Sequence, residues 1–197
     1  MARAARVFPI SRRSARRCRS SILHSPRRSK RIVRTAFNRR PVRWREQRAA
    51  YRIQVPGPLY CDTSALLKLY VSEPGSDEFN RMVQGREDLF VSDLTVTEVA
   101  SALARRLRHG AGTLETARLM QHAILERLDG GIYHRVELTR DVHRRAERFL
   151  LSLIETPLRA ADALHLALAT SAHAASLASF DARLGAAARA VGLVTYP

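Results

Sequence analysis

The stretch Arg159-Ala-Ala-Asp-Ala-Leu-His-Leu-Ala-Leu-Ala-Thr170 has apolar residues on every face of the helix that it predicts. A helix of this kind is normally buried. Asp162 is the exception within it, because a lone buried carboxylate must take up a proton, pair with a cationic side chain or hold a cation. Arg159 is the only cationic residue within one turn. The stretch therefore raises the question of whether Asp162 belongs to a metal site.

Short strands and helices alternate around this stretch. Apolar runs predict strands at about 59–63, 89–91, 132–138, 176–179 and 193–195, and helical spacing predicts helices at about 65–71, 75–84, 94–107, 113–129, 139–154, 160–174 and 182–190. Ser64, Thr113 and Thr139 are candidate helix caps. Such alternation predicts an α/β fold with three layers, in which helices cover both faces of a central, mainly parallel sheet.

The charge of the chain is concentrated at its N-terminal end. Residues 1–52 contain 18 of the 34 Lys and Arg residues and one acid, Glu46, so they carry a net charge of +17. The other 16 basic and 17 acidic residues leave the rest of the chain at −1. Dense like charge without regular apolar spacing predicts disorder. We therefore divide the chain into a basic, disordered extension, residues 1–56, and a folded domain, residues 57–197.

Three interpretations of the basic extension stay open. Its Arg residues suit an arm that binds RNA or a membrane, and an Arg-rich, acid-poor start also suits an organelle transit peptide. Alternatively, the translation start is placed too far upstream and the codon of Val55 is the true initiator. No apolar run reaches the roughly 20 residues needed to cross a bilayer, and two cysteines make no disulfide framework. We expect a cytoplasmic protein without membrane contact.

Four acids fall where a parallel sheet forms its sites. Asp62 ends the first predicted strand and Asp181 closely follows the fourth, while Glu98 and Asp162 lie in the first turns of two helices. Sites in open α/β sheets form beyond the carboxyl ends of the strands. Clustered carboxylates repel one another unless a cation neutralises them, and oxygen ligands suit Mg²⁺ or Mn²⁺. Two such ions can activate water for phosphodiester cleavage.

Simpler interpretations also exist, and Asp162 is the acid that they explain least. Asp62 and Asp181 can cap the helices that follow them, and Glu98 can be a surface acid near a helix N-terminus. Neither a cap nor a solvent role explains Asp162 among its apolar neighbours. The combination of the four acids is therefore more specific than any one of them.

Four segments of the chain carry a family resemblance. They are Leu59-Tyr-Cys-Asp62-Thr-Ser-Ala-Leu-Leu-Lys-Leu-Tyr70, Thr95-Val-Thr-Glu98-Val-Ala-Ser-Ala-Leu, Ala161-Asp162-Ala-Leu-His165-Leu-Ala and Ser179-Phe-Asp181. In order and spacing they resemble the PIN-domain nucleases, above all the VapC-type toxins of bacterial toxin–antitoxin pairs. The resemblance covers about residues 57–197 and has no counterpart for residues 1–56, which favours the misplaced start.

The resemblance implies both an activity and partners. It implies a Mg²⁺- or Mn²⁺-dependent endoribonuclease that cleaves RNA with a metal-activated water, a homodimer, and a cognate antitoxin that covers the acidic groove. Asp62, Glu98, Asp162 and Asp181 match the family's acidic quartet, which serves as both catalytic and metal-binding residues. Ser64 matches a small hydroxyl residue that helps to order the site.

Other residues are supporting candidates. His165 can orient Asp162, contact RNA or simply pack in the core, and Arg159 can contact substrate phosphates. Arg105, Arg106 and Arg108 can steer RNA or simply favour a helix C-terminus.

Two rival functions need to be weighed. An aspartate-nucleophile phosphatase would use Asp62 but usually has a second acid two residues later, where this chain has Ser64. A non-catalytic PIN scaffold would bind RNA through the basic arm, and the intact quartet of acids argues against it.

Overall fold

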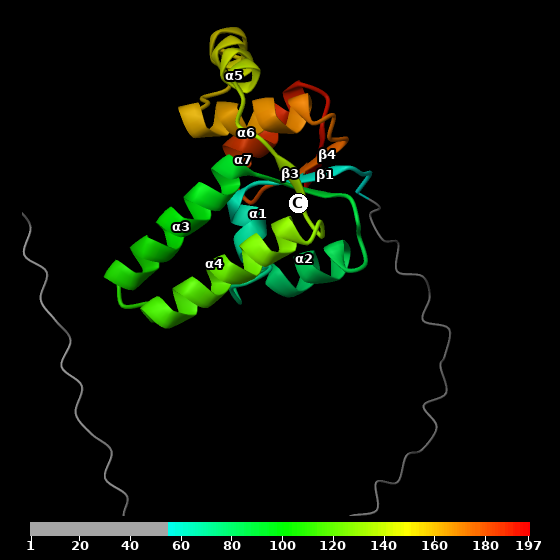
Figure 1. The fold of residues 1–197 in the computed structure, drawn as a ribbon. Coiled ribbons are helices and arrows are strands. Elements are labelled where there is room, and N and C mark those ends of the chain that lie inside the picture. Colours follow the sequence, from blue (N-terminus) through cyan, green and yellow to red (C-terminus); the bar gives the residue numbers. More distant parts are fainter. Residues whose placement is uncertain (1–54) are drawn as a thin grey trace, which may run out of the picture. The chain divides into compact units, whose positions relative to one another are not determined.

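The computed structural model describes residues 55–197, in which helices and strands alternate as predicted (Figure 1). The strands are β1 (Leu59–Cys61), β2 (Leu89–Ser92), β3 (His134–Val136), β4 (Ser176–Ala178) and β5 (Val194–Tyr196). The helices are α1 (Thr63–Lys68), α2 (Ser76–Val83), α3 (Asp93–Arg108), α4 (Leu114–Asp129), α5 (Arg140–Ser152), α6 (Ala160–Ser171) and α7 (Ala182–Ala190).

The basic extension expected at residues 1–56 lies outside the described residues, except for its last two. Val55 is buried in the hydrophobic core. The carbonyl oxygen of Pro56 accepts a hydrogen bond from the hydroxyl of Ser176. These two residues, on the N-terminal side of the expected boundary, therefore already contact the domain.

The five strands form one sheet in the order β3-β2-β1-β4-β5, and every neighbouring pair is parallel. From β1, in the middle, the chain moves outward through β2 to β3 and then returns to β4 on the other side of β1. The position between β1 and β4 is a topological switch point, where open α/β sheets form their binding sites. The predicted parallel sheet is confirmed.

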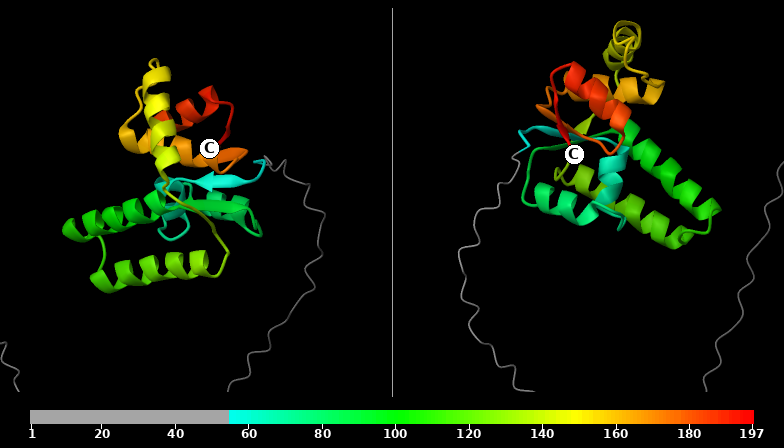
Figure 2. Two further views of the ribbon diagram at one scale, coloured as in Figure 1. Left: turned by 45° about the horizontal axis from the view of Figure 1, so that its top comes forward. Right: turned by 180° about the vertical axis from the view of Figure 1, so that it is seen from behind.

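Helices cover both faces of this sheet (Figures 1 and 2). Side chains alternate between the faces along each strand. In β1, Leu59 and Cys61 pack into a core with residues of α1–α4, whereas Tyr60 packs into a second core with residues of α5–α7. The α/β/α architecture with three layers is thereby confirmed, and each layer of helices has its own buried core.

Several helices begin with a side-chain cap at the carboxyl edge of the sheet. Asp62 caps α1, Ser92 caps α3 and Asp181 caps α7, each accepting a hydrogen bond from a backbone N–H in the first turn.

The caps predicted at Thr113 and Thr139 are confirmed. The cap predicted at Ser64 is wrong, because Ser64 is the second residue of α1. A carboxylate one position before the helix takes that role.

The predicted strand at 132–138 is shorter than expected and is confined to β3. This strand lies at the edge of the sheet and pairs only with β2, so no second neighbour extends it. Within the described residues, no helix combines the length and the apolar character required to span a membrane.

Candidate active site

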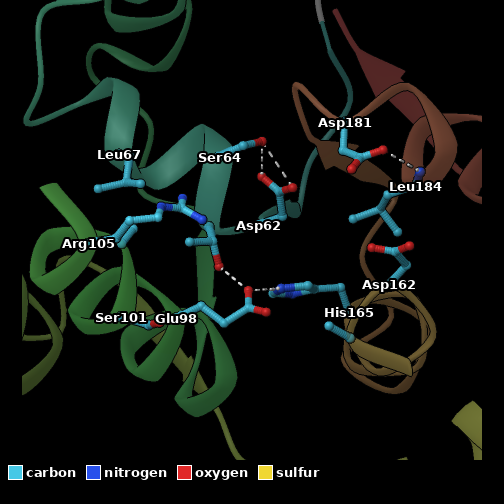
Figure 3. Close-up of a pocket in the computed structure, with 13 residues that line it drawn as sticks. Asp62, Ser64, Leu67, Glu98, Ser101, Arg105, Asp162, His165, Asp181 and Leu184 are labelled. Atoms are coloured by element: carbon cyan, nitrogen blue, oxygen red, sulfur yellow. Dashed lines mark hydrogen bonds and ion pairs between the residues drawn. The ribbon is translucent and has the colours of Figure 1, made fainter. Parts of the chain in front are cut away.

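A cavity of about 330 Å³ lies beyond the carboxyl ends of β1 and β4 (Figure 3). Side chains of α1 and α3 line one side, and side chains of α6 and α7 line the other. The lining includes all four predicted acids, Asp62, Glu98, Asp162 and Asp181. The four acids thus come from four separate segments to one cavity, as we expected from the sequence.

The chain path explains why these acids meet. Asp62 directly follows β1, and Asp181 comes three residues after the end of β4. Glu98 lies in the second turn of α3, which directly follows β2. Asp162 is the third residue of α6, which leads back to the start of β4. All four positions belong to the carboxyl edge of the sheet.

Asp62 is the buried acid of the site, with only 4% of its surface exposed. The hydroxyls of Ser64 and Ser179 donate to its carboxylate across 2.8 and 2.6 Å, and the N–H of Ala65 donates across 2.8 Å. Burial raises the pKa of Asp62 above its ordinary value, although these hydrogen bonds act in the opposite direction. A cation in the cavity would stabilise the ionised carboxylate.

Glu98 is held between two side chains on other helices. The Nε2 atom of His165 lies 2.8 Å from Oε2 of Glu98, and the hydroxyl of Thr63 donates to the same oxygen. The hydrogen bond from His165, more than the one from Thr63, holds the pKa of Glu98 below its ordinary value despite partial burial. The carboxylate is therefore ionised and fixed in orientation.

Asp181 combines the functions of helix cap and ion-pair partner. Its carboxylate accepts a hydrogen bond from the backbone N–H of Arg183 at 2.8 Å and pairs with the guanidinium of the same residue at 3.1 Å. The hydrogen bond from the Arg183 side chain is the main reason that the pKa of Asp181 is lowered. The cap interpretation and a place in the cavity are thus both correct for this residue.

The structure corrects the expectation for Asp162. The helix around it is buried as predicted, but Asp162 itself is partly exposed. Its carboxylate accepts a hydrogen bond of 2.9 Å from the backbone N–H of Arg159. Because Asp162 lies in the first turn, it faces the open cavity and satisfies the helix N-terminus. The desolvated carboxylate of the site is Asp62.

The supporting candidates fall into two groups. Ser64 and His165 line the cavity. Of the roles left open for His165, the structure shows a contact with Glu98 on α3 in place of one with Asp162 on its own helix. Arg159 is exposed and absent from the lining, and only its backbone contacts Asp162.

Sequence patterns did not assign several contacts of the site. Thr63 and Ser179 bond to the acids, yet no role was predicted for either, although both lie within the quoted motifs. Arg105 lines the cavity, whereas Arg106 pairs with Glu73 outside it. The position of the Arg cluster at the end of a helix gave no sign of this difference.

The donor set fits a hard divalent cation, since it offers carboxylate oxygens without thiolates. Within residues 55–197, no group of three or more His, Cys, Asp or Glu side chains is close enough together to hold a metal ion. The acids thus line one cavity, but no three of them lie together as the ligands of a single ion would. The buried Asp62 supplies an independent reason for a cation, because its charge lacks a Lys or Arg partner among the described residues.

Comparisons with known proteins agree with this fold. The family model for the PIN domain matches residues 59–190. The structure of VapC20 from Mycobacterium tuberculosis, described as a sarcin–ricin loop cleaving toxin, is similar with a TM-score of 0.54 and 19% identity over 66% of this chain and 94% of that one.

Two further solved structures are similar. PAE2754 from Pyrobaculum aerophilum has a TM-score of 0.50 and 22% identity over 70% of this chain and 82% of that one. FitAcB from Neisseria gonorrhoeae has a TM-score of 0.49 and 17% identity over 71% and 96% of the two chains. No curated protein matches the chain.

Proposed function

The chain belongs to the PIN domain family, and from this premise we propose that it is a Mg²⁺- or Mn²⁺-dependent endoribonuclease, the toxin of a toxin–antitoxin pair. One observation carries the proposal. Asp62, Glu98, Asp162 and Asp181 come from four separate segments and line one cavity at the carboxyl edge of a parallel sheet. Structural roles account for single acids, but they do not account for four acids at one cavity.

The four acids are the residues that would hold the cation. Carboxylate oxygens are the ligands that Mg²⁺ and Mn²⁺ prefer. When bound, such a cation supplies Lewis-acid activation of water and neutralises charge on the phosphodiester. The raised pKa of the buried Asp62 and the lowered pKa of Glu98 indicate different electrostatic settings for these two ligands.

The remaining residues of the cavity hold the acids and meet the substrate. Ser64 and Ser179 fix Asp62, while Thr63 and His165 fix Glu98.

Among the described residues, Arg105 is the one Lys or Arg whose side chain lines this cavity. Its guanidinium points toward the centre of the cavity in Figure 3. Since RNA carries negative charge to a site that is itself acidic, we assign Arg105 to phosphate binding.

The proposed reaction is the hydrolysis of an RNA phosphodiester. Water adds to phosphorus, and the bond from phosphorus to the 3′ oxygen breaks. The products are then a 5′-phosphate and a 3′-hydroxyl, as the family resemblance implies. No covalent intermediate with the protein is needed.

The proposal extends to partners and location. VapC20, one of the solved structures similar to this chain, is described as a toxin. The family resemblance implies a homodimer and an antitoxin that covers the acidic cavity. The cytoplasmic location that we expect from the sequence stays part of the proposal. These features belong to the proposal together with the activity.

A cleavage assay tests the proposal. The full chain, incubated with labelled RNA and Mg²⁺ or Mn²⁺, should cut it internally, and EDTA should stop the reaction. Asp62→Ala and Asp162→Ala should abolish cleavage and growth arrest, whereas Asp129→Asn, which alters an exposed acid outside the cavity, should not. Undiminished cleavage by both alanine variants would disprove the site.

Deletion of residues 1–54 separates the nuclease from a scaffold that acts through the basic arm. The nuclease should keep cleaving after the deletion. A scaffold should lose RNA affinity together with the steep salt dependence that many phosphate contacts produce.

A further inference from the structure

A row of hydrogen bonds leads from Glu98 into the core of the domain. His165 contacts Glu98 through Nε2, and its Nδ1 lies 2.8 Å from the hydroxyl oxygen of Tyr60 in β1. The same hydroxyl lies 2.8 Å from Oγ of Ser92, at the end of β2. Ser92 in turn contacts the hydroxyl of Thr95 at 2.9 Å. The row thus links a cavity-lining acid to the ends of the two central strands.

The row is shielded from water. His165 is 3% exposed, and Tyr60, Ser92 and Thr95 are fully buried. An unpaired polar group at such a depth loses its hydration without compensation, so each member depends on its neighbours. Burial raises the pKa of Tyr60, which keeps its hydroxyl protonated and available as a hydrogen-bond donor.

The chemistry of the row fixes the ring of His165. The ionised carboxylate of Glu98 can only accept, so Nε2 of His165 must carry the hydrogen between them. Tyr60 holds the other ring nitrogen, Nδ1. With both nitrogens occupied, the ring can neither flip nor turn without losing the buried hydrogen bond to Tyr60 and the partly buried one to Glu98.

Packing alone does not explain the hydroxyl of Tyr60. Its partners in the neighbouring strands are Phe90 and Leu177, and its surroundings on this face are the apolar side chains of α5–α7. A Phe ring would fill the same space without a buried polar atom. The hydroxyl is needed only for its contacts with His165 and Ser92.

We propose that Tyr60 is a positioning residue of the candidate site: acting through His165, it sets the orientation in which Glu98 meets a divalent cation. This inference rests on the proposed function, because it concerns the same cavity. Residues that orient ligands through hydrogen bonds typically change metal affinity or activity by 10–100-fold when they are mutated. Tyr60 reaches the cavity only through His165, so it does not contact substrate.

Tyr60→Phe in the full chain tests the inference, with Mn²⁺ as the probe. Electron paramagnetic resonance measures free Mn²⁺ without RNA, so the readout does not depend on cleavage. We expect Mn²⁺ affinity to fall about tenfold and kcat for RNA cleavage to fall, with KM for RNA unchanged. Only an interaction with the reacting centre would produce this split.

Tyr70→Phe is the matched control. The hydroxyl of Tyr70 lies 3.0 Å from that of Tyr133, outside the cavity, so this variant also loses one hydroxyl from a hydrogen-bonded pair. Mn²⁺ affinity should stay at the wild-type value. If Tyr60→Phe does not fold, His165→Gln serves as the test variant. The amide of the new side chain can still donate to Glu98 but does not reach Tyr60. We expect the same tenfold loss of Mn²⁺ affinity.

Two results overturn the inference. One is wild-type Mn²⁺ affinity in a folded Tyr60→Phe or His165→Gln variant, and the other is an equal loss of affinity in Tyr70→Phe. Both leave the proposed nuclease intact when the wild-type protein binds Mn²⁺ and cleaves RNA. A wild-type protein that does neither contradicts the proposed function itself.

Discussion

The hydroxyl of Ser179 lies 2.6 Å from Oδ2 of Asp62 and joins two residues that are 117 positions apart in the chain. Ser179 also accepts a hydrogen bond from the backbone N–H of Asp181, and Ser64 likewise donates to Asp62 while accepting from the N–H of Phe180. Two serines therefore tie the end of β1 to the turn before α7. Through them the positions of Asp62 and Asp181 depend on each other.

We predict that Ser179→Ala weakens both the fold and the site. The variant removes the shorter of two hydrogen bonds to Oδ2 of the buried Asp62 and leaves the backbone N–H of Asp181 without this partner. The free energy of unfolding should fall by about 2 kcal/mol, and Mn²⁺ affinity and RNA cleavage should fall with it. Urea unfolding and Mn²⁺ titration measure the two effects separately.

Ser176→Ala is the control for this prediction. Ser176 is a buried serine of β4 whose hydroxyl donates to Pro56, away from the cavity. It should lose comparable stability and keep its Mn²⁺ affinity. Equal Mn²⁺ affinities in the two variants would show that Ser179 supports only the fold.

The burial of Asp62 predicts a stability cost that depends on pH. In the folded, cation-free protein its pKa is raised above the ordinary 3.8 of an unfolded chain. As the pH rises, the unfolded chain therefore loses this proton before the folded protein does. In the window above 3.8, the folded protein then binds more protons, and the free energy of unfolding falls with rising pH. Asp62→Asn removes this titration and should unfold at a higher temperature at neutral pH.

The measurement is the thermal unfolding of the wild type and of Asp62→Asn in EDTA from pH 4 to pH 7. This window runs from just above the ordinary pKa of an aspartate to neutral pH. The advantage of Asp62→Asn over the wild type should grow with pH. Glu98 and Asp181 have lowered pKa values and stabilise the folded state more at higher pH, but they act in both proteins and cancel. An advantage that is constant across pH would mean that the carboxyl titrates normally.

The two roles of Asp162 can be separated by two substitutions. Asp162→Asn keeps an oxygen that can accept from the N–H of Arg159 and removes the charge, whereas Asp162→Ala removes both. We expect Asp162→Ala to lose about 1 kcal/mol of stability and Asp162→Asn to lose little, while Mn²⁺ binding weakens in both. Wild-type Mn²⁺ binding in Asp162→Asn would mean that Asp162 serves only to accept the hydrogen bond at the start of α6.

The fold was predictable because its signals are local. The helical spacing of Val96, Val99 and Leu103 and the apolar run Leu89-Phe90-Val91 each depend on a few adjacent residues. Both elements formed where expected, and their alternation determined the layers. The length of β3 was less predictable, because it depends on pairing with β2 alone.

The acids of the site were predictable from their positions at strand ends and helix starts, but their environments were not. Burial of Asp162 was inferred from its neighbours in sequence, yet its place in the first turn leaves it partly exposed. Asp62, which has fewer apolar neighbours, is the buried acid. The contacts from Tyr60 to His165 and from Ser179 to Asp62 span more than 100 positions, and a single sequence carries no signal for them.

Arg105 and Arg108 offer a test of substrate binding on a single helix. Both are exposed and lie near the end of α3, but only Arg105 lines the cavity. If Arg105 contacts a phosphate of bound RNA, Arg105→Ala should raise KM about fivefold and reduce the slope of log affinity against log salt by about 1.

Arg108→Ala removes the same charge from the same helix and therefore controls for long-range attraction. A general electrostatic effect should lower RNA affinity equally in both variants, because it depends on net charge rather than position. A phosphate contact should appear only in Arg105→Ala, with kcat nearly unchanged, since uniform binding is lost without loss of chemistry. Fluorescence anisotropy with non-cleaved RNA in Ca²⁺, at several salt concentrations, distinguishes the two. Equal salt slopes in both variants would place the phosphate contact elsewhere.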